Sequence, residues 1–104
     1  MIKREKRRYL TLKVDCAKPL TEKDVLDAVY CSVLRLFGEV GASKANLRMI
    51  KCVPEKSQFV LRCSHLMLEQ VRAAVVCVTE FDSATVAFHV VGVSGTLKAL
   101  AKKT

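Results

Sequence analysis

The chain has 104 residues, of which 51% are hydrophobic and 27% are charged, a length and balance typical of one folded domain rather than a disordered tail. Its formal net charge of +8 favours an anionic partner, such as nucleic acid, an acidic membrane surface or an acidic protein. The longest stretch without Asp, Glu, Lys or Arg, residues 83–97, is shorter than the roughly 18 apolar residues that a membrane-spanning helix needs, so we expect no membrane span.

The first half of the chain predicts a strand, a helix and a second strand. Residues 8–15 alternate between apolar and polar side chains, as in a half-buried strand. Thr21 and Asp24 have the spacing of a helix-capping pattern, and apolar residues at helical spacing follow. Gly38 suits the left-handed position that ends a helix. Residues 46–53 then predict the second strand.

The second half predicts a hairpin, a helix and a last strand. Ser64 is in position to cap the second helix. The remaining elements are, in chain order, a turn at residues 54–57, a strand at 58–63, a turn at 80–83, a strand at 85–91, a loop at 92–95 and a short terminal helix at 96–103.

The order β-α-β-β-α-β is that of an α+β, ferredoxin-like (RRM-like) sandwich with a four-stranded antiparallel sheet, to which a short C-terminal helix is added. Residues 1–7 are expected to form a basic arm, and residues 8–104 a single domain. In this topology the first and fourth strands are antiparallel neighbours. The start of the first strand should therefore lie beside the end of the fourth.

Basic residues are concentrated at the two ends of the chain. Residues 3–8 and 98–103 together hold eight basic residues and one acidic residue, whereas residues 9–97 hold ten basic and nine acidic residues. Because the fold should bring the ends together, we expect one basic patch that could bind the phosphates of a nucleic acid. Its members would be Lys3, Arg4, Lys6, Arg7, Arg8, Lys98, Lys102 and Lys103.

Residues 92–98 (GVSGTLK) could bind a phosphate between the last strand and the terminal helix. Ser94, Gly95, Thr96 and Lys98 would supply hydroxyls, close backbone approach and a charge. An ordinary turn capped by Thr96 explains the pattern equally well. Arg62, on the exposed side of the third strand, is a further RNA-binding candidate, but one aromatic residue on this face is too few for an RRM-type stacking platform.

Catalytic and metal-binding patterns are missing from the sequence. The chain has two histidines and five cysteines but no C-x-x-C pair, so we expect reduced thiols, no catalytic residue and no metal site. The last strand is apolar on both sides, which predicts a surface covered by a partner. The candidates for this surface are Val33, Leu36, Phe88 and Val91.

Four segments together resemble the ribonuclease P protein component 2 family, whose members are small archaeal subunits with a eukaryotic counterpart in nuclear ribonuclease P and ribonuclease MRP. The segments are residues 8–10 (RYL), 28–39 (AVYCSVLRLFGE), 60–63 (VLRC) and 90–98 (VVGVSGTLK). The resemblance runs in one register from Arg8 to the end. No acidic run follows Lys103, which favours the archaeal form.

The resemblance implies a protein subunit of an RNA-based endonuclease that removes 5′ leaders from precursor tRNA, with Mg²⁺ held by the RNA and no cofactor bound by the protein. It implies contact with the ribonuclease P RNA and with component 3, a TIM-barrel-like protein, in a homodimer or heterotetramer, without a membrane. The location would be cytoplasmic in an archaeon, or the nucleus or nucleolus in a eukaryote. A ferredoxin-like metabolite-binding or protein-interaction module, and a stand-alone RNA-processing enzyme, remain alternatives.

Overall fold

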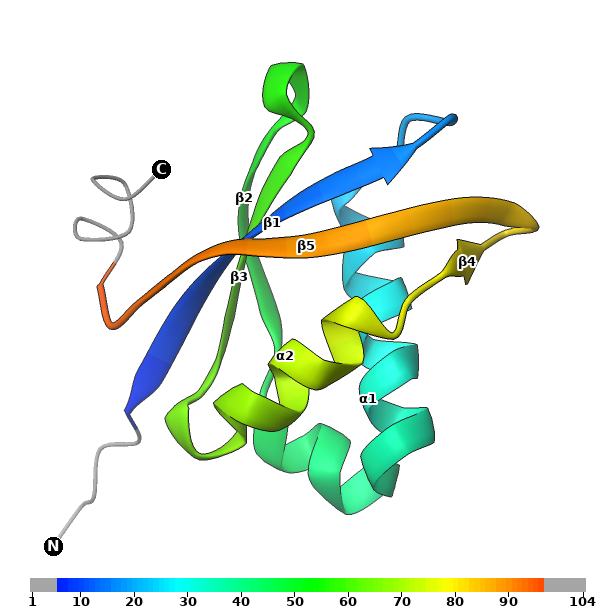
Figure 1. Cartoon of the computed structure of the whole chain (residues 1–104). Helices are drawn as coiled ribbons and strands as arrows, with labels where there is room; N and C mark the ends of the chain where they lie inside the picture. Colours follow the sequence, from blue (N-terminus) through cyan, green and yellow to red (C-terminus); the bar gives the residue numbers. More distant parts are fainter. Residues whose placement is uncertain (1–5, 97–104) are drawn as a thin grey trace, which may run out of the picture.

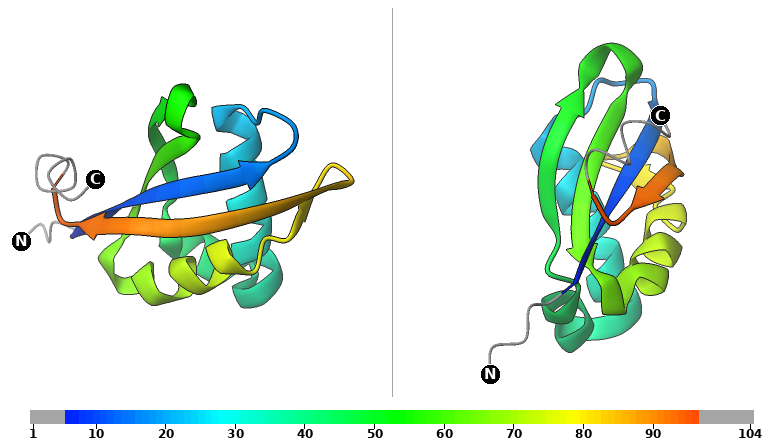
Figure 2. Two further views of the ribbon diagram at one scale, coloured as in Figure 1. Left: turned by 45° about the horizontal axis from the view of Figure 1, so that its top comes forward. Right: turned by 90° about the vertical axis from the view of Figure 1, so that its left-hand side faces the viewer.

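The computed structural model describes residues 6–96. Five strands form a sheet in the order β2-β3-β1-β5-β4, and every neighbouring pair is antiparallel. The α-helices lie together on one face of this sheet (Figures 1 and 2). The elements are β1 (Arg7–Cys16), α1 (Glu22–Ala45), β2 (Arg48–Val53), the 3₁₀ turn η1 (Pro54–Lys56), β3 (Gln58–Ser64), the 3₁₀ turn η2 (His65–Met67), α2 (Leu68–Val76), β4 (Glu80–Phe81) and β5 (Ala84–Ser94).

β1 is central because it pairs with β3 on one side and with β5 on the other. Its alternating pattern has the predicted effect: Leu10, Leu12 and Val14 are buried in the hydrophobic core beneath the helices. The ferredoxin-like order is confirmed, with one correction. The predicted turn at residues 80–83 begins with the short strand β4, which pairs with the start of β5 and makes the fifth strand.

α1 begins where the sequence predicts but continues past Gly38. The Thr21 hydroxyl accepts a hydrogen bond from the Asp24 N–H, and the Asp24 carboxylate accepts one from the Thr21 N–H, so the capping box is complete. Gly38 has φ 75° and ψ −178°, which kinks the helix without ending it. The helix ends only at Asn46, which adopts the left-handed conformation.

α2 packs against α1 through small and β-branched side chains. The Ser32 hydroxyl of α1 donates a buried hydrogen bond of 2.7 Å to the Ala74 carbonyl of α2. Ser64 was predicted to cap this helix, but its side chain makes no capping hydrogen bond, because η2 is inserted before the helix begins at Leu68. This hydrogen bond fixes the position of α2 relative to α1 on the helical face of the sheet.

β5 is longer than predicted. It continues through Gly92 and Val93 to Ser94, so the loop expected at residues 92–95 is wrong for these three residues. They are strand because Tyr9, Leu10 and Thr11 of β1 pair with them. The terminal helix predicted at residues 96–103 lies outside the described residues, apart from Thr96.

Candidate nucleic-acid interface

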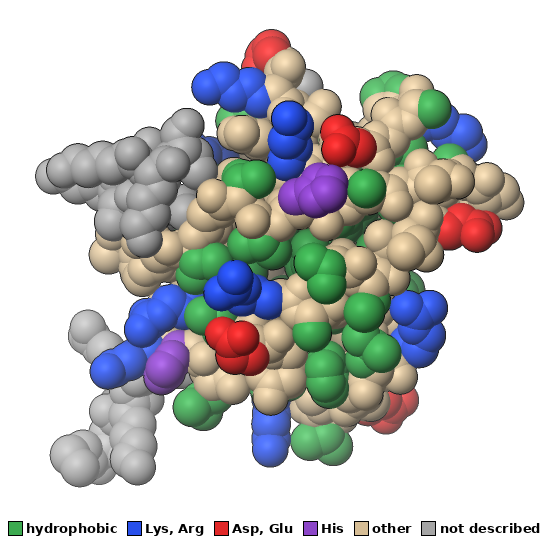
Figure 3. Space-filling view, viewed as in Figure 1, with side chains coloured by type: hydrophobic (Ala, Val, Ile, Leu, Met, Phe, Trp, Pro, Cys, Tyr) green, Lys and Arg blue, Asp and Glu red, His purple; other side chains and the backbone are tan. Residues whose placement is uncertain are grey.

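Basic side chains gather at the end of the sheet where β1 begins. Lys6, Arg7 and Arg8 lie at the start of β1, and Arg62 and Arg48 lie at the adjoining ends of β3 and β2. The Lys6 carbonyl accepts a 2.9 Å hydrogen bond from the N–H of residue 65, which attaches this segment to the domain. We call these five residues the basic end; Figure 3 shows Lys and Arg side chains together beside the start of β1.

The opposite end of the molecule is rich in carboxylates. It carries Asp15, Glu22, Asp24, Asp27, Glu55, Glu80 and Asp82, which lie at the end of β1, in the first turns of α1, in η1 and around the β4–β5 turn. Within residues 6–96, the one ion pair joins His89 Nε2 to Asp15 Oδ2 at 3.4 Å. No described carboxylate forms an ion pair with the basic end, so its positive charge is available to an anionic ligand.

Two arginines of the basic end lie directly opposite each other on neighbouring strands. Arg48 of β2 pairs with Arg62 of β3, and Arg62 in turn pairs with Tyr9 of β1. These side chains share the sheet face opposite the helices, because Leu61 and Cys63, the neighbours of Arg62, point into the core. Like charges directly opposite each other destabilise a sheet. The Nε of Arg62 is buried and has no hydrogen-bond partner. A phosphate oxygen would relieve both costs.

The start of β1 and the end of β5 meet as the sequence predicts (Figure 2, left). Tyr9 pairs with Ser94, and a Cβ added at Gly95 would lie 3.2 Å from Nη1 of Arg8. Ser94 is buried at the end of β5, and its hydroxyl accepts a 3.4 Å hydrogen bond from the Thr96 N–H. Here the side chain of Ser94 accepts and the backbone of Thr96 donates, so the bond does not test the alternative of a turn capped by the Thr96 side chain. Phosphate binding by Ser94, Gly95 and Thr96 stays a prediction.

Other members of the predicted patch fall outside the described residues: Lys3, Arg4, Lys98, Lys102 and Lys103. Within the described residues, the structure adds Arg48, which the sequence analysis did not single out.

Arg8 faces the core side of the sheet at the start of β1. Burial raises the pKa of the Cys63 thiol to about 11, while the positive charge of Arg8 acts in the opposite direction.

The predicted partner surface is wrong for two of its four residues. Val33 and Phe88 are 0% and 3% exposed, so both belong to the core and cannot meet a partner. They are buried because the inner face of β5 and the inner side of α1 both pack into the hydrophobic cluster between helices and sheet. Leu36 and Val91 are 43% and 45% exposed and remain candidates.

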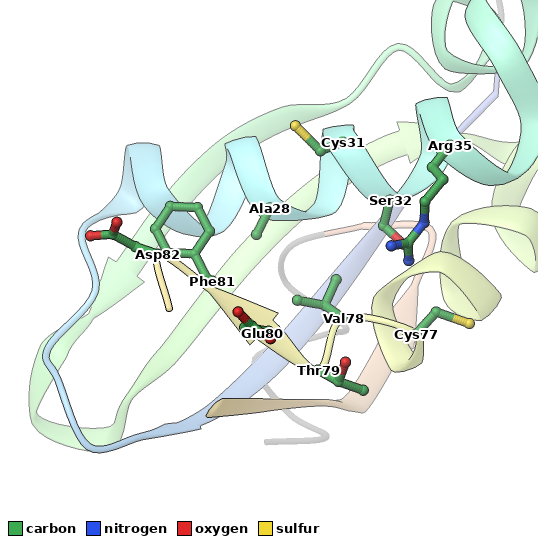
Figure 4. Close-up of a pocket in the computed structure, with 10 residues that line it drawn as sticks. All are labelled: Ala28, Cys31, Ser32, Arg35, Cys77, Val78, Thr79, Glu80, Phe81 and Asp82. Atoms are coloured by element: carbon green, nitrogen blue, oxygen red, sulfur yellow. The ribbon is translucent and has the colours of Figure 1, made fainter. Parts of the chain in front are cut away.

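A cavity of about 460 Å³ lies between α1 and the segment that follows α2. Cys31 and Cys77 line it, but their sulfur atoms point away from one another (Figure 4). Arg35, Glu80 and Asp82 also line it, and no histidine does. In residues 6–96, no three His, Cys, Asp or Glu side chains are arranged to hold a metal ion, and no helix there is long and apolar enough to cross a membrane. The basic end is therefore a stronger candidate for a functional site than this cavity.

The chain is similar in sequence and in fold to protein components of ribonuclease P and ribonuclease MRP. Residues 8–104 match the model of the Rpp14/Pop5 family. The chain is 31% identical over 100 residues to ribonuclease P protein component 2 of Methanosarcina mazei, covering 96% of this chain and 84% of that protein. It is 34% identical over 101 residues to the component of the same name from Thermococcus kodakarensis, covering 96% and 83%. A chain in the cryo-EM structure of yeast ribonuclease MRP has the same fold, with a TM-score of 0.69 at 10% identity over 93% of this chain and 79% of that one.

Proposed function

Because this chain belongs to the Rpp14/Pop5 family, we propose that it is a protein subunit of ribonuclease P that binds the RNA of the particle through its basic end. The observation that carries the proposal is the charge arrangement. Five basic residues from three strands converge on one end of the sheet, and no described carboxylate pairs with them.

The proposed role of the chain is to position RNA rather than to react with it. The arginine fork donates several hydrogen bonds in a fixed plane, which suits it to phosphate. The β-sheet supplies rigid spacing, because directly opposite Cβ atoms on neighbouring strands lie about 4.5–5.5 Å apart. Arg48 and Arg62 together can therefore hold one phosphate or two successive phosphates of a folded RNA.

Cleavage itself would belong to the RNA of the particle. In this proposal the RNA holds Mg²⁺ and removes the 5′ leader of precursor tRNA, while the protein lowers the repulsion between RNA phosphates. Component 3 is the expected protein partner, and the exposed Leu36 and Val91 are the residues we assign to a protein contact. The proposed location is the archaeal cytoplasm.

Affinity purification of the full-length tagged chain from its own cells tests the proposal. We expect ribonuclease P RNA and a TIM-barrel-like protein in the eluate, together with activity that removes the 5′ leader of a precursor tRNA. An Arg48→Gln/Arg62→Gln variant should recover less of the RNA while keeping its thermal midpoint, since removing both of these facing positive charges ends their repulsion and does not weaken the sheet. Recovery of neither the RNA nor the activity with the unaltered chain would refute the proposed function.

A further inference from the structure

A cavity of about 620 Å³ lies beside the basic end, between the last turn of α1 and η2. Its volume is in the range of small-ligand pockets. The residues that line it are Ser43, Lys44, Asn46, Ser64, Leu66 and Met67. It adjoins the basic end directly, because Ser64 pairs with Arg7 across the β1–β3 ladder and Arg48 follows two residues after Asn46.

A serine hydroxyl belongs to the wall of this cavity. Ser64 lines the cavity, and its side chain makes no capping hydrogen bond to η2. A hydroxyl both donates and accepts hydrogen bonds, so it can pair with the polar edge of a ligand.

The rest of the wall is apolar on one side and polar on the other. Leu66 is 78% exposed, and Met67 lies next to it, so both can offer apolar surface to a ligand. Asn46, which ends α1, contributes an exposed amide. The last carbonyls of a helix have no partner within the helix and carry partial negative charge, so this end of α1 accepts N–H donors and disfavours a phosphate inside the cavity.

We propose that this cavity binds one unpaired nucleobase of an RNA strand whose phosphates lie on the basic end. A nucleobase has an apolar face, which suits Leu66 and Met67, and a polar edge, which suits Asn46, the Ser64 hydroxyl and the free carbonyls of α1. Lys44, at the rim, faces the sugar–phosphate backbone. This inference rests on the proposed function, because it names the part of the RNA, an unpaired base, that binds beside the basic end.

Two single strands of equal charge separate base binding from phosphate binding. The probes are a 12-nucleotide RNA of mixed sequence and a 12-unit abasic ribose-phosphate strand, each titrated against the full-length chain in the same salt. We expect the RNA to bind at least about five-fold more tightly, the contribution of about one stacked base. Equal affinity for both strands would overturn the nucleobase site and leave RNA binding by charge intact. Binding to neither strand would count against the proposed function as well.

Single substitutions assign the preference to the cavity. Ser64→Ala and Leu66→Ala should each reduce the RNA-over-abasic ratio by two-fold or more and leave the affinity for the abasic strand unchanged. Val76→Ala is the matched control, because Val76 is also strongly exposed, at 61%, but lies at the far end of α2, outside the cavity. Thermal midpoints of all three should equal that of the unaltered chain.

Cross-linking provides an independent readout. An RNA that carries 4-thiouridine should cross-link within residues 64–67, and Leu66→Ala should reduce the yield. If neither substitution changes the ratio and the cross-links fall elsewhere, the cavity does not hold a base. An occupant of another class, such as a side chain of a protein partner, would then have to be considered.

Discussion

Neutralising the basic end should lower the salt dependence of RNA binding far more than an equal change of charge elsewhere. The variant Lys6→Gln/Arg7→Gln/Arg48→Gln removes three positive charges from exposed side chains that form no described ion pair. Each phosphate contact contributes about 0.7 to the slope of log affinity against log salt for single-stranded RNA and about 0.9 for a duplex. Losing three contacts should therefore reduce the slope by about 2.1 to 2.7. A four-fold rise in salt would then weaken RNA binding by the unaltered chain about 18-fold to 42-fold more than binding by the variant.

The matched control changes the same net charge at the opposite end. Lys18, Lys23 and Lys56 are exposed and lie beside the carboxylates there, so Lys18→Gln/Lys23→Gln/Lys56→Gln should leave the slope within about 0.5 of the original. Fluorescence anisotropy with a labelled ribonuclease P RNA fragment at five or more salt concentrations gives each slope. Equal reductions in the two triple variants would show that net charge alone governs binding. No reduction in either would refute the placement of the RNA on the basic end.

Three further predictions concern stability. Gly38→Ala should lower the unfolding free energy by about 1–3 kcal/mol in chemical denaturation, because φ 75° with ψ −178° is a conformation that side chains other than glycine rarely adopt. Ser32→Ala should cost about 0.5–1.5 kcal/mol, since it removes the buried hydrogen bond between the helices while the Ala74 carbonyl still accepts one from the Cys77 N–H; Ser32→Thr, which keeps the hydroxyl, should cost less in the same assay. Raising the pH from about 9 to 11 should destabilise the chain, because the Cys63 thiol ionises near 9 when unfolded but has a pKa of about 11 when folded, so the unfolded state loses its proton first. The loss should disappear in Cys63→Ala, and an unchanged pH profile would contradict burial as its cause, although Arg8 opposes the shift.

Most of the secondary structure follows from local pattern. The alternation in β1 and the Thr21 cap of α1 are properties of neighbouring residues, and both are present as predicted. The errors have a different origin. Gly38 is the residue type that commonly ends a helix, but the helix resumes after the kink and places Ala42 and Ala45 in the hydrophobic core, a tertiary contact that local propensity does not encode. The short strand β4 forms because β5 provides a partner for it.

In the candidate site, too, some features follow from the local sequence pattern and others from tertiary contacts. Charge counting along the sequence identifies the start of β1, and the β-α-β-β-α-β order brings the end of β5 beside it, so the meeting of Tyr9 with Ser94 was predictable. Arg62 was predictable as well, because strand alternation opposite Leu61 places it on the outer face. These inferences need only the period of a strand and the order of the elements.

Arg48 and the nucleobase cavity depend on tertiary structure. The turn after β2 pairs Val53 with residue 58, and an unbroken register from there would place Arg48 opposite Cys63, on the core face. An irregularity between Met49 and Lys51 shifts the register by one residue, so that Arg48 pairs with Arg62 on the outer face instead. The cavity likewise forms only because α1 ends beside η2, more than fifteen residues away in sequence. Local sequence pattern therefore predicts the main helices and strands, their order and the charged ends. Which residues meet at the site depends on the pairing register and on the packing of distant segments, because these arise from contacts between strands and helices rather than from local propensity.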